Sequence, residues 1–251
     1  MQILFKFCLI ITFMLYLIGL GLNDENDLSL KALEIAKKCD CYCELYTSIW
    51  QGSLENLSNM IGKEIKILKR KDLEENLEIL LEKARENDIA VFVPGDPLVA
   101  TTHIDLVLEA KKKRVKTKVI HNSSIFSAIG EVGLQIYKFG KTATIPLNGK
   151  MENVKSTVKN NRKLGLHTLL LLDLDNEINI YMNVFDALKL LLKEKIVSKS
   201  DSLIVFSDAG GKSEIYYDTV RSLVWKRIPL PAVLVIPGKL HFREKEFLEM
   251  L

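Results

Sequence analysis

The sequence predicts an α/β fold made of two α/β domains with a crevice between them. Patterns typical of strand, loop and helix alternate through the first half, which favours right-handed βαβ units around a parallel sheet. In that half, residues 89–93 are uninterrupted apolar sequence, as expected of a strand buried on both faces. The chain has 251 residues, of which 48% are hydrophobic, so it can bury a sizeable core.

The first domain is expected over residues 14–122. An apolar run at 15–18 ends at Gly19 and predicts the first strand. The helix that follows could be capped by one of three polar residues, Asn23, Asp24 or Asp27. Hydrophobic periodicity predicts further strands over 39–46, 64–68, 89–93 and 117–120, and helices over 28–38, 73–85, 101–112 and 125–132.

The second domain is expected over residues 123–251 and is organised differently. Periodicity predicts strands over 142–146, 167–173, 202–207 and 232–236, and helices over 154–164, 183–195 and 217–225.

Composition excludes several classes of protein. The net charge of +3 is too small an excess to favour a nucleic-acid partner. Cys39, Cys41 and Cys43 alternate along a predicted strand and would share one face, where we expect small buried hydrophobes in a reducing compartment. A zinc site would need a second cluster of cysteines or histidines, and the four histidines are scattered, so no metal site is predicted.

The N-terminal 22 residues are apolar with a single charge at Lys6, which alone is typical of a signal peptide or a membrane anchor. However, Met14 begins the predicted first strand, and cleavage after Gly21 would remove part of a glycine turn. We therefore interpret residues 1–13 as an upstream extension of a protein with no membrane partner. A membrane-anchored enzyme is the alternative.

Two turns after predicted strands could carry chemistry. Gly19-Leu20-Gly21 would let backbone amides approach a ligand, but a plain tight turn explains it equally well. The third glycine of a dinucleotide fingerprint would fall at Asp24, which argues against an NAD site. The run 94–97 (Pro-Gly-Asp-Pro) would place Asp96 at the carboxyl end of the sheet, where open α/β folds bind ligands. A solvated turn is the simpler interpretation. A carboxylate there would also suit S-adenosylmethionine, which carries an ammonium and a sulfonium.

Several sequence blocks resemble the diphthine synthases, in the tetrapyrrole methylase-like class of S-adenosylmethionine-dependent methyltransferases. The blocks span almost everything from Met14 to the end and occur in the family's order. They are 15–22, Lys37-Lys38-Cys39, Glu44, Tyr46-Thr47-Ser48, Gly95-Asp96-Pro97, 100–103, 119–122, Ser124-Ile125, 137–140, 165–168 and 237–241.

The resemblance implies methylation of the modified histidine of translation elongation factor 2, by a cytoplasmic enzyme that is usually a homodimer. It places the cofactor contacts on eight residues: Leu22, Asp96, Val99, Ser124, Ile125, Leu172, Ala209 and Ala232. Two positions depart from the family, because relatives usually carry a basic residue at Asp208 and a histidine near Ala232. Asn122 and residues 158–172 are closer to eukaryotic members, which add a fourth methyl as an ester.

Three alternatives stay open at this point. One is a methyltransferase of the same fold that acts on a tetrapyrrole or on RNA, although the blocks at 137–140 and 237–241 argue against it. Another is a cofactor-binding protein without turnover, given the departures at Asp208 and Ala232. The third is the membrane-anchored protein. The sequence offers no compelling general base for methyl transfer to an amine.

Overall fold

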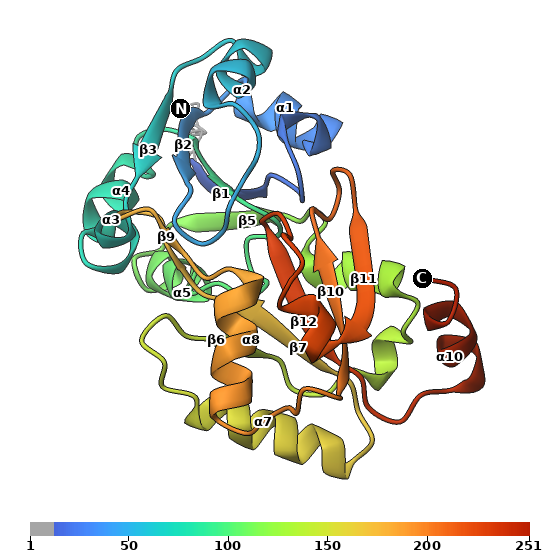
Figure 1. Ribbon diagram of the computed structural model, residues 1–251. Coiled ribbons are helices and arrows are strands. Elements are labelled where there is room, and N and C mark those ends of the chain that lie inside the picture. Colours follow the sequence, from blue (N-terminus) through green and yellow to red (C-terminus); the bar gives the residue numbers. More distant parts are fainter. Residues whose placement is uncertain (1–12) are drawn as a thin grey trace, which may run out of the picture.

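The computed structural model describes residues 13–251, in which the strands form two five-stranded sheets that follow one another along the chain (Figure 1). Strands of the first sheet all lie within residues 14–120, and strands of the second lie within 143–236. A small two-stranded sheet of β8 (Leu174–Asp175) and β9 (Ile180–Tyr181) is also present. The predicted α/β class is therefore confirmed, while the interpretation of residues 1–13 as an upstream extension falls, up to residue 12, outside the described part.

The first sheet is entirely parallel, with the strand order β3-β2-β4-β1-β5. Its strands are β1 (Met14–Gly19), β2 (Asp40–Glu44), β3 (Ile65–Leu68), β4 (Ile89–Val93) and β5 (Lys116–Ile120). Its helices are α1 (Leu30–Ala36), α2 (Leu54–Ile61), α3 (Arg70–Glu74), α4 (Leu77–Lys83) and α5 (Ile104–Lys112). Because the strands run in one direction, their carboxyl ends and the loops that follow gather along one edge.

Both faces of the first sheet are buried. Leu15 and Leu17 of β1 pack in a cluster with side chains from α3, α4 and α5, whereas Ile18 packs on the opposite face with side chains from α1 and α2. Burial on two faces explains why β4 is apolar at every position.

The predicted cysteine face is confirmed for the three cysteines that the structure describes. Cys39, Cys41 and Cys43 are free thiols buried in one apolar cluster. Burial raises the pKa of Cys39 to about 12 and that of Cys41 to about 11, so both stay protonated at neutral pH.

The second sheet is mixed, with the strand order β11-β10-β12-β7-β6, and only its β6–β7 pair is parallel. Its strands are β6 (Ala143–Ile145), β7 (Thr168–Leu172), β10 (Ser202–Ser207), β11 (Glu214–Thr219) and β12 (Ala232–Ile236). The helices of this half are α6 (Ile125–Ala128), α7 (Glu152–Lys163), α8 (Val184–Lys193), α9 (Val220–Leu223) and α10 (Phe242–Leu248). Short 3₁₀ turns cover Glu25–Asp27, Ile129–Val132 and Ile136–Lys138.

Four helix predictions were wrong in detail. The helix expected over 73–85 is two helices, α3 and α4, separated at Glu75 and Asn76, where asparagine favours a non-helical backbone. The helix expected from 101 begins at Ile104, because the Thr101 hydroxyl bonds to Pro97 O at 2.6 Å and holds a turn.

The other two errors concern a cap and a strand. The residue that caps α1 is Ser29, whose Oγ accepts from Ala32 N at 3.2 Å, whereas Asp24 caps the 3₁₀ turn before it. The helix expected over 217–225 begins only at Val220, because the residues before it form β11, which pairs with β10 as a hairpin. The strand that pairs with these residues, β10, lies outside the range 217–225, so the pattern of that range alone does not reveal the pairing. Within residues 13–251, no helix has the length and apolar character needed to cross a bilayer.

Candidate functional site

The loops after β1 and β4 are joined through two glycines. Gly21 N donates to Gly95 O at 3.2 Å, and Gly95 N donates to Gly21 O at 2.8 Å. Both residues have positive φ, +86° and +69°, which only glycine adopts without strain. Gly19 is required for a different reason, since a Cβ there would lie 2.5 Å from Gly95 O.

Asn122, which follows β5, hydrogen-bonds to the loop after β1 and so connects it to the carboxyl end of a third strand. Its Nδ2 donates to Gly19 O and to Asp27 O, each at 3.0 Å. Two residues later, Ser124 begins α6 in a reciprocal capping arrangement with Ser127. The carboxyl ends of β4, β1 and β5, which are neighbours in the sheet, therefore meet in one connected set of loops.

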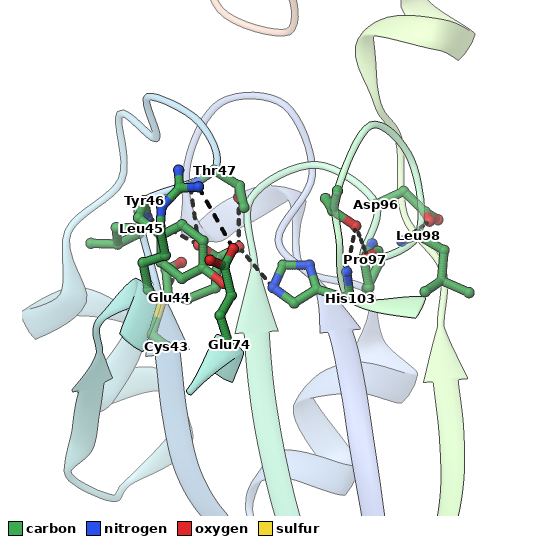
Figure 2. A network of polar contacts seen from close by, with 12 residues as sticks. Cys43, Glu44, Leu45, Tyr46, Thr47, Glu74, Asp96, Pro97, Leu98 and His103 are labelled. Atoms are coloured by element: carbon green, nitrogen blue, oxygen red, sulfur yellow. Dashed lines mark hydrogen bonds and ion pairs between the residues drawn. The ribbon is translucent and has the colours of Figure 1, made fainter. Parts of the chain in front are cut away.

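Asp96 binds protein groups with both of its carboxylate oxygens, in the loop drawn in Figure 2. Oδ1 accepts from Leu98 N at 3.0 Å, while Oδ2 contacts His121 Nδ1 at 2.8 Å and accepts from Asn122 N at 3.2 Å. The residue is only 5% exposed. Its carboxylate thus ties the loop after β4 to the loop after β5 while the residue lines the cavity described next.

A cavity of about 440 Å³ opens where these loops face the second sheet. Its size is within the range of ligand pockets, about 300–1,000 Å³. All eight residues expected to contact the cofactor line it: Leu22, Asp96, Val99, Ser124, Ile125, Leu172, Ala209 and Ala232. Five come from the first sheet's loops and the start of α6, and three come from β7, β12 and the loop after β10. Tertiary structure therefore gathers residues from both halves around one space.

The two positions that depart from the family differ in location. Ala232 lines the cavity, but Asp208 does not. The Asp208 carboxylate accepts from the Gln51 side-chain amide and from Lys212 N, the latter at 2.8 Å. Asp208 therefore holds its own turn and contacts the first half of the molecule behind the cavity wall.

The cavity also has a polar wall that the sequence patterns do not reveal as a site. Its polar wall consists of Tyr46, Thr47, Arg70, Glu74, Thr101 and Thr102. The family resemblance includes the blocks around Tyr46-Thr47 and Thr101-Thr102, but it implies no role for them. Arg70 and Glu74 carried no signal, because single charges on a surface helix are ordinary.

Glu44, the last residue of β2, lies directly behind this polar wall (Figure 2). Its Oε2 accepts from Tyr46 N at 3.0 Å and Thr47 N at 3.1 Å, and its Oε1 accepts from Thr47 Oγ1 at 2.6 Å. The residue is fully buried. Burial raises the pKa of Glu44 to about 7, although the hydrogen bonds from Thr47 and Tyr46 act in the opposite direction.

His103 lies between the Glu44 loop and the Asp96 loop (Figure 2). Its Nε2 is 3.7 Å from Glu44 Oε1, beyond hydrogen-bond distance. Burial lowers the pKa of His103 to about 4, so the imidazole is neutral at neutral pH. Within residues 13–251, the buried hydroxyl of Tyr46 has no hydrogen-bond partner. The backbone of Pro97 interacts with the His103 ring and partly opposes the lowering of its pKa. Unpartnered buried groups are rare in proteins and commonly mark functional sites.

Blocks from the second half build a separate polar network that does not line the cavity. Glu244 of α10 forms an ion pair with Lys138, accepts from Gln135 N and His241 N at 2.9 and 2.6 Å, and contacts His167 Nε2 at 3.1 Å. His167 Nδ1 accepts from Gly238 N at 2.9 Å, so Nε2 carries the proton. Burial alone would raise the pKa of Glu244, but Lys138 and the hydrogen bonds lower it to about 2.

Comparisons with known proteins agree along nearly the whole chain. The family described as Tetrapyrrole (Corrin/Porphyrin) Methylases matches residues 14–223. A diphthine synthase from Methanocaldococcus jannaschii is 42% identical over 253 residues, covering 95% of this chain and 98% of the relative. One from Methanococcus vannielii is 40% identical with the same coverage. A solved crystal structure of diphthine synthase superposes with a TM-score of 0.89 at 38% identity, covering 94% of this chain and 95% of the other.

Proposed function

Because the chain belongs to the tetrapyrrole methylase family and, within it, to the diphthine synthases, we propose that it transfers methyl groups from S-adenosylmethionine to the modified histidine of translation elongation factor 2. The observation that carries the proposal is the cavity, because eight residues assigned from family resemblance, scattered from position 22 to position 232, line this one space.

The residues around the cavity suit S-adenosylmethionine. Gly21 and Gly95 line the cavity without side chains, and a Cβ on Gly21, or on Gly19 just before it, would collide with neighbouring atoms. Leu22, Val99, Ile125 and Leu172 supply apolar walls, while Asp96 and Ser124 supply polar ones. When bound, the cofactor supplies a methyl group already activated on a sulfonium. The protein's task is then to align the acceptor, which can be worth about 7–11 kcal/mol.

The proposal also covers the domains, the cellular location and the oligomeric state of the protein. The protein has two domains, 14–122 and 123–251, with the cofactor in the cleft between them, and it works in the cytoplasm as a homodimer. The presence of one sheet in each range supports the two domains, and the three free thiols among the described residues support a reducing compartment. Cytoplasmic action also follows from the proposed substrate, which is a translation factor.

Mass spectrometry of elongation factor 2 tests the proposal. The purified chain is incubated with S-adenosylmethionine and with factor 2 that carries the unmethylated modified histidine. We expect mass increases of whole methyl groups at that one residue, and their number distinguishes an amine product from one that also carries a methyl ester. A porphyrin precursor serves as the comparison substrate. Methylation of the precursor and not of factor 2 would refute the proposal.

A further inference from the structure

We infer that Thr47 and Glu44 together accept the proton that the acceptor amine must lose before methyl transfer, an inference that rests on the proposed function. Thr47 contacts the amine from the cavity wall, and Glu44 acts through Thr47 as the group on which the proton comes to rest. The backbone N–H groups of Tyr46 and Thr47 position the carboxyl group.

The geometry places a hydroxyl between the cavity and a buried carboxyl group. Thr47 lines the cavity, and its Oγ1 donates to Glu44 Oε1 at 2.6 Å. An oxygen that donates its only proton still has lone pairs with which to accept a hydrogen bond from a ligand. Glu44 has no exposed surface and is not part of the cavity wall, so it can exchange protons with the cavity only through such a neighbour.

The groups around Glu44 keep the pKa of its carboxyl group at about 7. His103, at the start of α5, is neutral and therefore does not hold Glu44 ionised as a salt-bridge partner would. From α3, the Arg70 charge favours the ionised carboxylate, and Glu74 on the same helix forms an ion pair with Arg70. Cys43 and Tyr46 are uncharged neighbours whose own pKa values burial raises. The pKa of Glu44, about 7, is thus suited to receiving and releasing a proton at neutral pH.

The proton balance is simple. An N–H bond of the ammonium breaks and an O–H bond forms on Thr47, while the original Thr47 proton passes to Glu44 Oε1. The carboxylate becomes a neutral carboxylic acid, and the nitrogen keeps the electron pair with which it then bonds to the methyl carbon. Glu44 returns its proton through Thr47 to solvent in the open cavity after the product leaves. No oxidant, reductant or further reactant is needed.

Direct titration gives a readout independent of turnover. In protein labelled with ¹³C at glutamate carboxyl carbons, one resonance should titrate with a midpoint of about 7. The resonance should be absent in Glu44→Gln. Its midpoint should move upward in Thr47→Val, because the lost hydrogen bond favours the ionised form. Glu25→Gln is the matched control, since Glu25 is another buried carboxylate that accepts from Ser53 N and Asn56 Nδ2 but does not line the cavity.

Kinetics then test the proton step. With elongation factor 2 as substrate, we expect Glu44→Gln and Thr47→Val to lower kcat by at least about 100-fold, the usual scale of positioned proton transfer. Cofactor affinity measured by calorimetry should stay within about threefold, less than 0.7 kcal/mol. The rise of the wild-type rate through about pH 7 should be lost in Glu44→Gln and kept in Glu25→Gln.

Two results would overturn the inference: a wild-type pH profile that survives in both Thr47→Val and Glu44→Gln, or a resonance near neutrality that survives Glu44→Gln. If Glu44→Gln does not fold, Thr47→Val decides the matter, because it leaves the buried carboxyl and its backbone hydrogen bonds in place. A wild-type protein that transfers no methyl to factor 2 would instead refute the proposed function.

Discussion

Leu22 and Gly210 pack against each other where the two halves of the molecule meet, so closely that a Cβ on Gly210 would lie 2.6 Å from the Leu22 Cβ. Leu22 follows β1 and lines the cavity, and Gly210 belongs to the loop between β10 and β11. We expect Gly210→Ala to displace Leu22 and to weaken the binding of S-adenosylmethionine by about tenfold, or 1.4 kcal/mol, in calorimetry.

Gly62→Ala is the control for that variant. Gly62 also has a positive φ, +76° against +86° for Gly210, but nothing lies within 4 Å of the position of its Cβ. It should lose a similar amount of stability, about 1 kcal/mol from backbone strain, and keep full cofactor affinity. Equal affinities for the two variants would show that Leu22 does not shape the binding site.

Asp96→Ala should weaken cofactor binding at least about tenfold, because it removes the hydrogen bond to Leu98 N within the loop after β4 and the bond to Asn122 N in the loop after β5. Calorimetry with S-adenosylmethionine measures the effect. His121→Ala should matter far less, since the His121 side chain is 67% exposed and the loss of one hydrogen bond costs about 0.5–1.5 kcal/mol. An unchanged affinity of Asp96→Ala for S-adenosylmethionine would show that Asp96 does not contribute to the cofactor site.

Asn122→Asp should destabilise the fold more than Asn122→Ala does. Alanine deletes the two hydrogen bonds to Gly19 O and Asp27 O, a loss of about 1–3 kcal/mol in urea unfolding. Aspartate additionally turns a carboxylate oxygen toward two carbonyl oxygens, which repel it. Ser123→Ala, at the exposed neighbouring residue, should leave the midpoint of urea unfolding unchanged. The reverse order of the two Asn122 variants would show that its amide is not the donor.

Glu244→Gln should lower the free energy of unfolding by about 3–5 kcal/mol at neutral pH, because Lys138 is left without its buried partner. The sign of the pH dependence follows from the pKa of Glu244, which folding lowers from 4.5 to about 2. Its stabilisation is complete above pH 4.5 and is lost as the pH falls toward 2, so wild-type stability should decline there more steeply than that of the variant.

Glu246→Gln on the same helix is the matched control, since its ion pair with Arg243 is exposed and should contribute little. Urea unfolding at a series of pH values measures all three proteins. Parallel pH curves for wild type and Glu244→Gln would contradict the lowered pKa.

The sequence by itself determined the elements whose signal is local. The apolar run at 89–93 is β4 with the predicted bounds, and 202–207 and 232–236 are β10 and β12. The glycine turns at Gly21 and Gly95 were recognisable because a positive φ favours glycine. Family resemblance also identified eight of the residues that line the cavity. Motifs shared by a family mark three-dimensional contacts that hydrophobic periodicity cannot reveal.

Only the tertiary structure decided how distant side chains meet. Nothing local marks Glu44 as a group with a pKa of about 7, because that value arises from burial between a loop, α3 and the start of α5. The strand β11 was missed for a similar reason: its partner β10 supplies the hydrogen bonds that outweigh its helical pattern. Local sequence fixes backbone preference over a few residues, whereas burial, pairing and electrostatic environment depend on neighbours that the fold brings from elsewhere in the chain.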